Sequence, residues 1–174
     1  EIKIDNLKNN RPKINVPLEP LDNIVDLMSA TILTMIVVYT AINFSDLSDT
    51  IPTHYNASGE PDGFGNKMYI WLLPAIGIAT FTVLFVLNKF PHFHNYKFNI
   101  TEDNALKNYR FMTRVFRFTD LFVAVLFVFI QYMMIEQGKG NASGFGAWFT
   151  PVIMVVSIVF AVLIVVYKHI INTS

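Results

Sequence analysis

The sequence contains no cysteine and carries few charges for its length. Without cysteine the chain has no disulfides, no thiolate metal sites and no cysteine nucleophile. Only 15% of its residues are charged, against about 25% in a typical soluble domain. Lysine plus arginine and aspartate plus glutamate number 13 each. The formal net charge is therefore zero, and overall electrostatics predicts no nucleic-acid partner.

Apolar side chains are in large excess. Hydrophobic residues make up 53% of the chain, and phenylalanine alone occurs 16 times. A soluble domain of this size still exposes roughly a third of the surface of its unfolded chain, which leaves too little interior for so many apolar groups. A lipid bilayer removes the conflict because its hydrocarbon layer is itself an apolar solvent. The composition therefore predicts an integral membrane protein.

Four apolar runs are long enough to cross a bilayer, since a spanning helix needs about 20 mostly apolar residues. They cover approximately residues 24–44, 68–87, 118–135 and 149–167, with no charged residue in their central parts. The predicted fold is all-α: an antiparallel bundle of four membrane-spanning helices over residues 22–174. Residues 1–21 contain three prolines and are predicted to form an extended arm.

The distribution of lysine and arginine predicts the orientation, because short cytoplasmic segments are enriched in these residues. The arm, the segment between the second and third spans, and the C-terminal end together carry eleven of the 13: Lys3, Lys8, Arg11, Lys13, Lys89, Lys97, Lys107, Arg110, Arg114, Arg117 and Lys168. The segments 45–67 and 136–148 carry only Lys67 and Lys139. Both termini are therefore expected in the cytoplasm and these two segments outside.

The third span is predicted to extend well into the cytoplasm. Thr101 is a good N-cap, followed by Glu102 and Asp103. A continuous helix over 102–136 would be about 50 Å long, against a hydrocarbon layer of about 30 Å. Arg110, Arg114 and Arg117 share one face of the extension. Binding of anionic lipid is the simplest consequence; pairing with Asp22, Asp26 or Glu102 is the alternative.

Asp22 and Asp26 stand at the start of the first span. Carboxylates at a helix N-terminus favour the positive end of the helix dipole, so capping and solvation at the interface is the simpler interpretation. A role in proton relay stays open because ionisable groups near a membrane core are often functional.

The outer segment after the first span is unusually rich in turn and hydrogen-bonding residues. Gly59, Gly63 and Gly65 permit a positive φ or close backbone approach, and the sequence Pro61-Asp62-Gly63 is a turn signal. We expect a compact, hydrogen-bonded structure at the membrane surface. The second outer segment, 138–146, is also glycine-rich and is interpreted as a flexible connection.

The first of these segments resembles a known family motif. Seven residue types are fixed over sixteen positions: Pro52, His54, Asn56, Gly59, Asp62, Gly65 and Lys67. The following span opens with Tyr69, Trp71 and Pro74. In these features the chain resembles small bacterial membrane proteins that carry domain of unknown function 1648, which include the SdpI-type toxin-immunity proteins.

A second resemblance lies in the inner segment, at Asn95-Tyr96 and in the run from Ile100 to Asn104 that leads to Tyr109, Arg110 and Arg114. The likeness covers about residues 24–117. It implies a multi-pass protein of the bacterial plasma membrane and no assigned reaction. Two surfaces are candidates for function. The first is the outer motif, to which Gly63 is added as an eighth residue. The second is a cytoplasmic face for lipid or a partner, formed by Asn104, Tyr109, Arg110, Arg114 and Arg117.

Three roles remain open for the outer motif. It binds or senses a secreted peptide, a toxin or another membrane protein; it is a rigid cap within a larger assembly, which leaves an oligomer open; or, as the weakest alternative, His54 and Asp62 serve an enzyme. A zinc site usually needs three or four protein ligands, and this segment has too few. We therefore predict a non-enzymatic protein with no catalytic residue, metal or cofactor.

Overall fold

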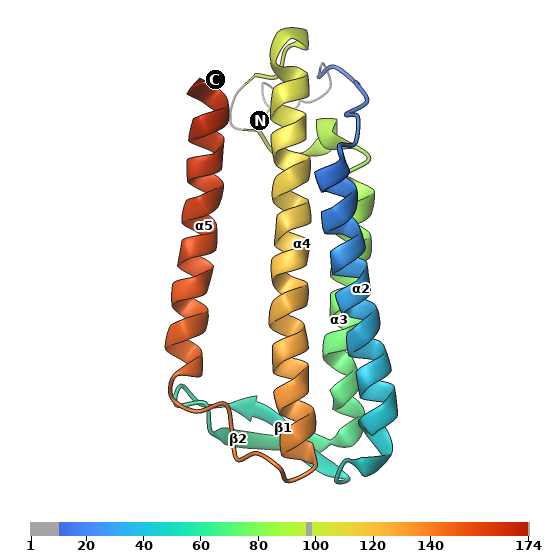
Figure 1. Ribbon diagram of the computed structural model, residues 1–174, viewed down its shortest axis with the longest axis vertical. Coiled ribbons are helices and arrows are strands. Elements are labelled where there is room, and N and C mark those ends of the chain that lie inside the picture. Colours follow the sequence, from blue (N-terminus) through green and yellow to red (C-terminus); the bar gives the residue numbers. More distant parts are fainter. Residues whose placement is uncertain (1–10, 97–98, 174) are drawn as a thin grey trace, which may run out of the picture.

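The computed structural model describes residues 11–96 and 99–173 (Figure 1). Four long helices lie side by side along the long axis: α2 (Pro20–Asn43), α3 (Leu72–Leu87), α4 (Glu102–Gly138) and α5 (Phe149–Thr173). The predicted all-α class is confirmed. Of the predicted arm, residues 1–10 lie outside the described residues. The segment that leads into α2 (blue) and the end of α5 (red) lie at the same end of the molecule, here called the arm end (Figure 1).

All four predicted spans lie on helices that are long and apolar enough to cross a membrane. These helical stretches are Pro20–Asp46, Lys67–Leu87, Glu102–Gly138 and Phe149–His169, within the part of the chain that the structure describes. The first includes the short helix η1 (Phe44–Asp46), and the second includes η2 (Lys67–Trp71). The chain therefore has the helices of a four-span membrane protein.

The long third helix is also confirmed. α4 contains 37 residues, which at about 1.5 Å per residue gives roughly 55 Å. Its first turn is fixed by a capping box, in which the Asn104 side chain accepts a hydrogen bond from the Thr101 backbone N–H at 3.1 Å. The N-terminal turns of α4 project beyond the other helices at the arm end (Figure 1).

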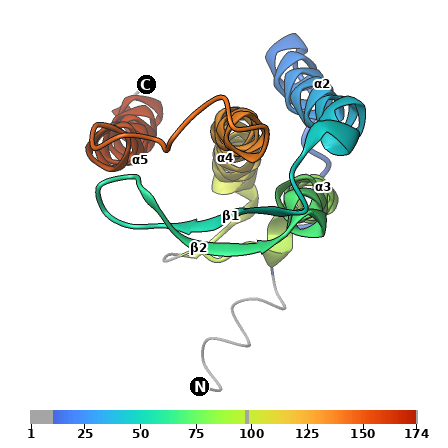
Figure 2. The same cartoon turned by 90° about the horizontal axis from the view of Figure 1, so that it is seen from below.

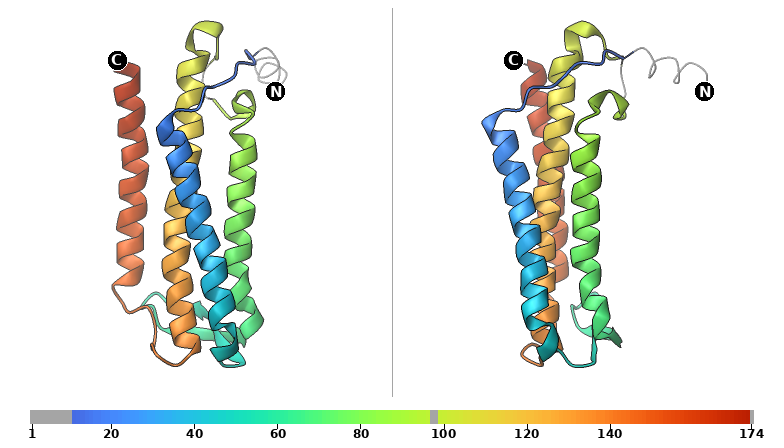
Figure 3. Two further views of the ribbon diagram at one scale, coloured as in Figure 1. Left: turned by 45° about the vertical axis from the view of Figure 1, so that its right-hand side comes forward. Right: turned by 90° about the vertical axis from the view of Figure 1, so that its right-hand side faces the viewer.

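Three of the helices form the packed part of the bundle. α2 and α3 flank one side of α4 (Figure 3), and Leu33, Ile36 and Ala124 are buried where α2 meets α4. α5 lies on the other side of α4 (Figure 2). It contacts α4 through aromatic pairs, such as Phe122 and Phe160, whose rings stack with centroids 4.4 Å apart. No residue in the apolar window of α5 is buried within the described chain, so most of this apolar helix faces away from the bundle.

The end of the bundle opposite the arm end, here called the hairpin end, is covered by a small sheet. β1 (Thr50–Tyr55) and β2 (Pro61–Asn66) form an antiparallel hairpin that crosses the end of the bundle from α3 towards α5 (Figure 2). Ile51 and Ile70 are fully buried beneath it, in a cluster with Ile135 and Phe145. The expected compact outer structure is thus a β-hairpin, which the sequence pattern did not indicate.

The arm end has a second small core. After η3 (Pro91–Phe93) the chain reaches Tyr96, which packs with Ile100, Ala105 and Tyr109, and Ile14 and Val16 of the arm cover them. Arg11 donates hydrogen bonds to the carbonyls of His92 at 3.1 Å and His94 at 2.6 Å. The described part of the arm therefore lies across the segment between α3 and α4.

Candidate functional site

The hairpin places the motif residues by a register with two irregularities. Thr50 pairs with Asn66, Pro52 with Phe64, His54 with Gly63 and Tyr55 with Pro61, and the register shifts on both sides of His54. Such bulges disturb the alternation of side chains along a strand. As a result Thr53 and His54 are both exposed, whereas Ile51 and Pro52 are both buried.

Asn56 builds the turn between the strands. Its side-chain oxygen accepts hydrogen bonds from the backbone N–H groups of Ser58 at 2.9 Å and Glu60 at 3.0 Å. Its backbone N–H donates to the Glu60 carbonyl, and Gly59 donates to the Asn56 carbonyl, both at 2.9 Å. Asn56 therefore has a structural role, because its side-chain oxygen binds backbone N–H groups of the turn that have no partner in the two-stranded sheet.

Two glycines of the motif are required by close contacts. Gly59 has φ +74°, and a Cβ there would lie 2.5 Å from the backbone oxygen of Gly146. A Cβ at Gly63 would lie 2.9 Å from the Cβ of His54 on the opposite strand. Both positions exclude a side chain for reasons of space, and Gly59 also for backbone conformation.

The turn docks on the segment between α4 and α5. The Phe145 N–H donates to the Gly59 carbonyl at 2.8 Å, and the rings of Tyr55 and Phe145 meet edge to face at 4.5 Å. Burial raises the pKa of Tyr55 to about 12. The interpretation of 138–146 as a flexible connection is wrong at this point, because Phe145 is almost fully buried and receives the hairpin.

Lys67 ends the motif with a structural contact. Its ammonium group lies 3.0 Å from the Asp49 carboxylate and 5.6 Å from the centroid of the Phe44 ring. Its backbone N–H donates to the Asp49 carbonyl. The side chain thus connects the end of the hairpin to the segment that follows α2.

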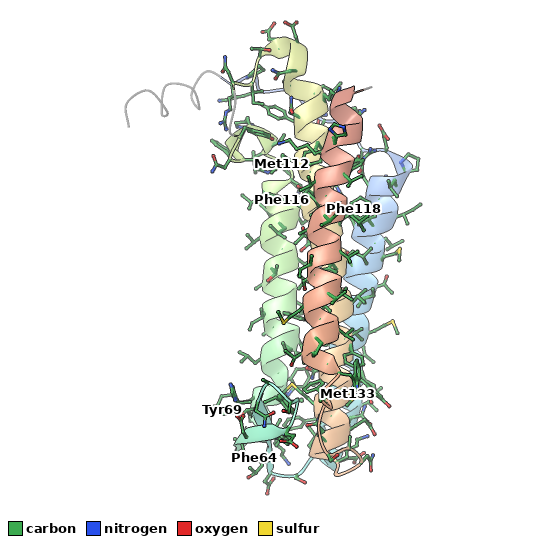
Figure 4. All side chains as sticks on the ribbon, turned by 90° about the vertical axis from the view of Figure 1, so that its left-hand side faces the viewer. Phe64, Tyr69, Met112, Phe116, Phe118 and Met133 are labelled. Carbon is green, nitrogen blue, oxygen red and sulfur yellow. The ribbon has the colours of Figure 1, made fainter. Side chains whose placement is uncertain are left out.

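His54 and Asp62 are the motif residues that the packing of the hairpin does not use. The Nδ1 atom of His54 lies 2.5 Å from an Asp62 carboxylate oxygen, and their side chains are 73% and 44% exposed. Phe64 follows on the same exposed face of β2, and Phe64 and Tyr69 lie near each other at this end of the molecule (Figure 4). The outward face of the hairpin therefore presents a His–Asp pair beside an exposed aromatic ring.

This pair lacks the partners of a metal centre. Within residues 11–96 and 99–173 no group of three or more His, Cys, Asp or Glu side chains is placed to hold a metal ion. An aspartate that hydrogen-bonds Nδ1 fixes the tautomer of the histidine, so that the other ring nitrogen, Nε2, is presented outward. In that arrangement Nε2 can offer an acceptor, or a donor when the ring is protonated, to a molecule outside.

The arginines of α4 face the carboxylates of α2. Arg114 donates to Asp22 at 3.1 Å, to the Tyr167 hydroxyl at 3.2 Å and to Glu19. Arg117 donates to Asp26 at 3.0 Å. The pairing alternative considered for Asp22 and Asp26 is present, and Glu19 is a partner that the sequence analysis did not consider.

The remaining arm-end candidates differ in exposure. Arg110 pairs with Glu19 at 3.0 Å. Tyr109 is fully buried and donates its hydroxyl to the Pro12 carbonyl at 3.0 Å, while Asn104 caps α4. The five candidates of this face, Asn104, Tyr109, Arg110, Arg114 and Arg117, therefore share one end of α4, but most of their polar groups bind other groups of the protein.

The sequence analysis did not identify one set of buried hydrogen bonds inside the bundle, those of Gln131. Gln131 is fully buried and donates to the Thr40 hydroxyl at 2.8 Å and the Ile70 carbonyl at 3.0 Å. It joins α2, α4 and η2 beneath the hairpin. A lone glutamine inside an apolar run was the available signal, because polar groups in spanning helices commonly bind across helices.

Known proteins are similar to this chain in the same region. Residues 31–78 match the family model described as Domain of unknown function (DUF1648), and this stretch runs from α2 through the hairpin into α3. An uncharacterized protein of Archaeoglobus fulgidus is 34% identical over 71 residues, which cover 36% of this chain and 39% of that protein. No solved structure matches. The predicted likeness to the DUF1648 family is confirmed.

Proposed function

We propose that this chain is a non-enzymatic protein of the bacterial plasma membrane that uses its outer hairpin to bind a molecule of the cell envelope. The role is of the toxin-immunity or sensing type, as in the SdpI-type proteins that the motif resembles. The motif consists of Pro52, His54, Asn56, Gly59, Asp62, Gly63, Gly65 and Lys67, in which His54 and Asp62 are the exposed binding pair and the other residues maintain the hairpin. Its ligand is a secreted peptide or toxin, or another membrane protein.

One observation carries the proposal: within the motif, the two exposed groups pair with each other. Asn56, Gly59 and Lys67 each serve a turn, a close approach or an ion pair. His54 and Asp62 instead stand on the outward face, where the bulged register holds them. An exposed, paired histidine beside an aromatic ring is typical of recognition, because it offers directional hydrogen bonds and apolar contact together.

The orientation is part of the proposal. Among the described residues, the arm end carries eight lysines and arginines: Arg11, Lys13, Lys89, Lys107, Arg110, Arg114, Arg117 and Lys168. The hairpin end carries Lys67 and Lys139. This asymmetry supports cytoplasmic termini and an outward hairpin. The division into an arm (1–21) and a membrane domain (22–174) and the cytoplasmic partner face on α4 belong to the same proposal.

The test separates binding from folding. Cells that depend on the protein for growth in spent medium of the source strain are complemented with His54→Gln or Asp62→Asn. Protection should be lost while the amount of protein in the membrane and its melting temperature in detergent are unchanged. Asp46→Asn is the matched control, because Asp46 is an exposed carboxylate of the same end. Full protection by both hairpin variants would contradict the proposal.

The alternative is that the hairpin is only a structural cap. It is favoured by the docking of the Gly59 carbonyl on Phe145 and by the apolar cluster beneath the sheet. On this alternative, His54→Gln and Asp62→Asn lower the amount or the melting temperature of the protein and leave protection intact per molecule. An enzymatic role of the same pair is the weaker alternative, since no third group of a catalytic site stands beside them in the described structure.

A further inference from the structure

A partly enclosed cavity lies at the arm end, far from the hairpin. It has a volume of about 210 Å³, and its walls come from the arm, α2, the end of α3 and α4. The residues with polar side chains in its lining are Asn15, Asp26, Asn88, Lys89 and Arg117, and the rest is apolar. The cavity therefore lies where the apolar spans end and charged side chains begin.

One polar group in this cavity has no partner. Asn88 is only 9% exposed, and its side-chain oxygen makes no hydrogen bond within the described part of the chain. Leaving a buried acceptor unsatisfied costs about 1–3 kcal/mol. The cavity thus offers an acceptor that a bound donor would satisfy.

Its charges favour an anion. Arg117 is 6% exposed and uses its Nε to bind Asp26 at 3.0 Å, while Lys89 lies along the Phe85 ring at 5.1 Å. Arg117 is balanced by Asp26 and by Asp22 at 4.0 Å, so Lys89 gives the lining its excess positive charge. A single phosphate diester would balance it, and Arg and Lys are the side chains that bind phosphate best.

An apolar cavity continues the site along the same pair of helices. About one turn deeper, Ala30, Leu33, Thr34, Val37, Ile78 and Phe81 enclose about 280 Å³ between α2 and α3. Phe81 stacks on Phe85, whose ring belongs to the polar cavity. At Gly77 the two helices approach closely, because a Cβ there would lie 2.8 Å from Leu33. The two cavities between α2 and α3 therefore form a groove with a polar mouth and an apolar floor.

We propose that this groove binds one anionic phospholipid whose headgroup carries hydroxyl donors, of the phosphatidylglycerol class. The phosphate lies against Lys89 and Arg117, a glycerol hydroxyl donates to the Asn88 oxygen, and an acyl chain follows Ala30 and Phe81 between the helices. The site is independent of the hairpin and does not rest on the function proposed for it.

Native mass spectrometry of the detergent-purified full chain tests the proposal. The probes are phosphatidylglycerol, phosphatidylethanolamine and phosphatidylcholine of equal chain length, added singly. Phosphatidylglycerol should bind with one-to-one stoichiometry and most tightly. Lys89→Gln should weaken it about tenfold, the equivalent of one charge-assisted hydrogen bond. Thr34→Phe, which fills the apolar cavity, should weaken it as well.

Matched controls come from the same helices. Lys107→Gln removes a charge of the arm end that does not line the cavity, and Thr82→Phe adds a ring to α3 outside the groove. Both should bind like the unmodified chain. Asn88→Leu should weaken phosphatidylglycerol binding while raising the melting temperature, because it removes an unsatisfied buried group.

Three results would overturn the proposal. Equal binding of phosphatidylglycerol and phosphatidylcholine would show that the polar mouth selects no headgroup. Equal losses in the cavity variants and in their controls would show ordinary solvation by surrounding lipid. If Asn88→Leu kept its phosphatidylglycerol binding and had a raised melting temperature, Asn88 would not accept a hydrogen bond from the glycerol hydroxyl, and the assignment of the headgroup would be wrong.

Discussion

Replacing Gly59 by alanine should detach the hairpin from the segment that connects α4 with α5. The new Cβ would stand 2.5 Å from the Gly146 backbone oxygen, so one backbone must move. The movement breaks the hydrogen bond that the Phe145 N–H donates to the Gly59 carbonyl at 2.8 Å in the native structure. The change therefore acts on one named hydrogen bond between two segments far apart in the sequence.

The magnitude follows from two contributions. A non-glycine residue at positive φ costs about 1–2 kcal/mol, and loss of the hydrogen bond costs about 0.5–1.5 kcal/mol. Together they lower the free energy of opening at Phe145 by about 2–3 kcal/mol. Since about 1.4 kcal/mol is a factor of ten, exchange of the Phe145 amide hydrogen should become roughly 30- to 150-fold faster.

Gly140→Ala supplies the matched control for this prediction. Gly140 has φ +81°, close to that of Gly59, but a Cβ there would meet no atom within 4 Å. Alanine at position 140 therefore has the same unfavourable positive φ as alanine at position 59, but its Cβ collides with no atom. Exchange at Phe145, measured by hydrogen–deuterium exchange in detergent micelles, should change less than about twofold in this variant, because no neighbouring atom is displaced and the hydrogen bond from Phe145 to Gly59 is kept. Equal acceleration in both variants would refute the docking argument.

Three further predictions concern the rest of the fold. Arg114→Ala should lower stability by about 3–5 kcal/mol, because the buried Asp22 carboxylate loses its hydrogen-bonded cation; a melting temperature in detergent no lower than that of Lys107→Ala would contradict this. Gln131→Leu should cost about 0.6–1.7 kcal/mol, the range for hydrogen bonds between membrane helices, and a second change, Thr40→Val, should then add little; additive losses would show that the two residues do not interact. Burial lowers the pKa of His94 below its ordinary 6.5, so the unfolded chain binds the extra proton more readily. The stability of the arm-end core is complete above pH 6.5 and falls as the pH drops below it; exchange rates there that are constant between pH 7 and pH 5, after correction for intrinsic rates, would contradict the assignment.

The spans were predictable because their cause is local. The run over 149–167 is so apolar that no other environment than lipid solvates it, whatever its neighbours are. The long α4 was predictable for the same reason, since Thr101 begins a helix and no proline or glycine follows before Gly138. Signals of this kind depend only on residues near one another in the chain.

The strands were not predictable from their own residues. Pro52, Gly63 and Gly65 interrupt the alternation of apolar and polar side chains that indicates a strand. β1 and β2 pair because Ile51 and Tyr55 can be buried against α4 and Phe145, which lie about ninety residues further along. The same holds for the cavity at Asn88, whose walls come from four separate segments, so no local pattern indicates it.

The arginine pairs show an intermediate case. The spacing of Arg110, Arg114 and Arg117 predicts a shared face but leaves the partner open, because lipid phosphates and carboxylates attract the same groups. Only the position of α2 decides between them. It places Asp22, which is 3% exposed, within hydrogen-bonding distance of Arg114, where a buried carboxylate needs a cation.

The contacts of α2 with α4 determine how an event at the hairpin would reach the other side of the membrane. At the hairpin end the two helices are joined by Tyr39 to Glu136 at 3.3 Å and by Lys139 to Asn43. At the arm end Arg114 and Arg117 join them again. A pair fixed at both ends transmits displacement along its axis, because packed helices do not deform continuously. α5 is held to α4 by aromatic pairs and by the Tyr167 hydroxyl, which accepts a hydrogen bond from Arg114 at 3.2 Å. A ligand that moved the hairpin would therefore act on the arm through α2 and α4, and cross-linking α2 to α4 near mid-span should leave that response intact.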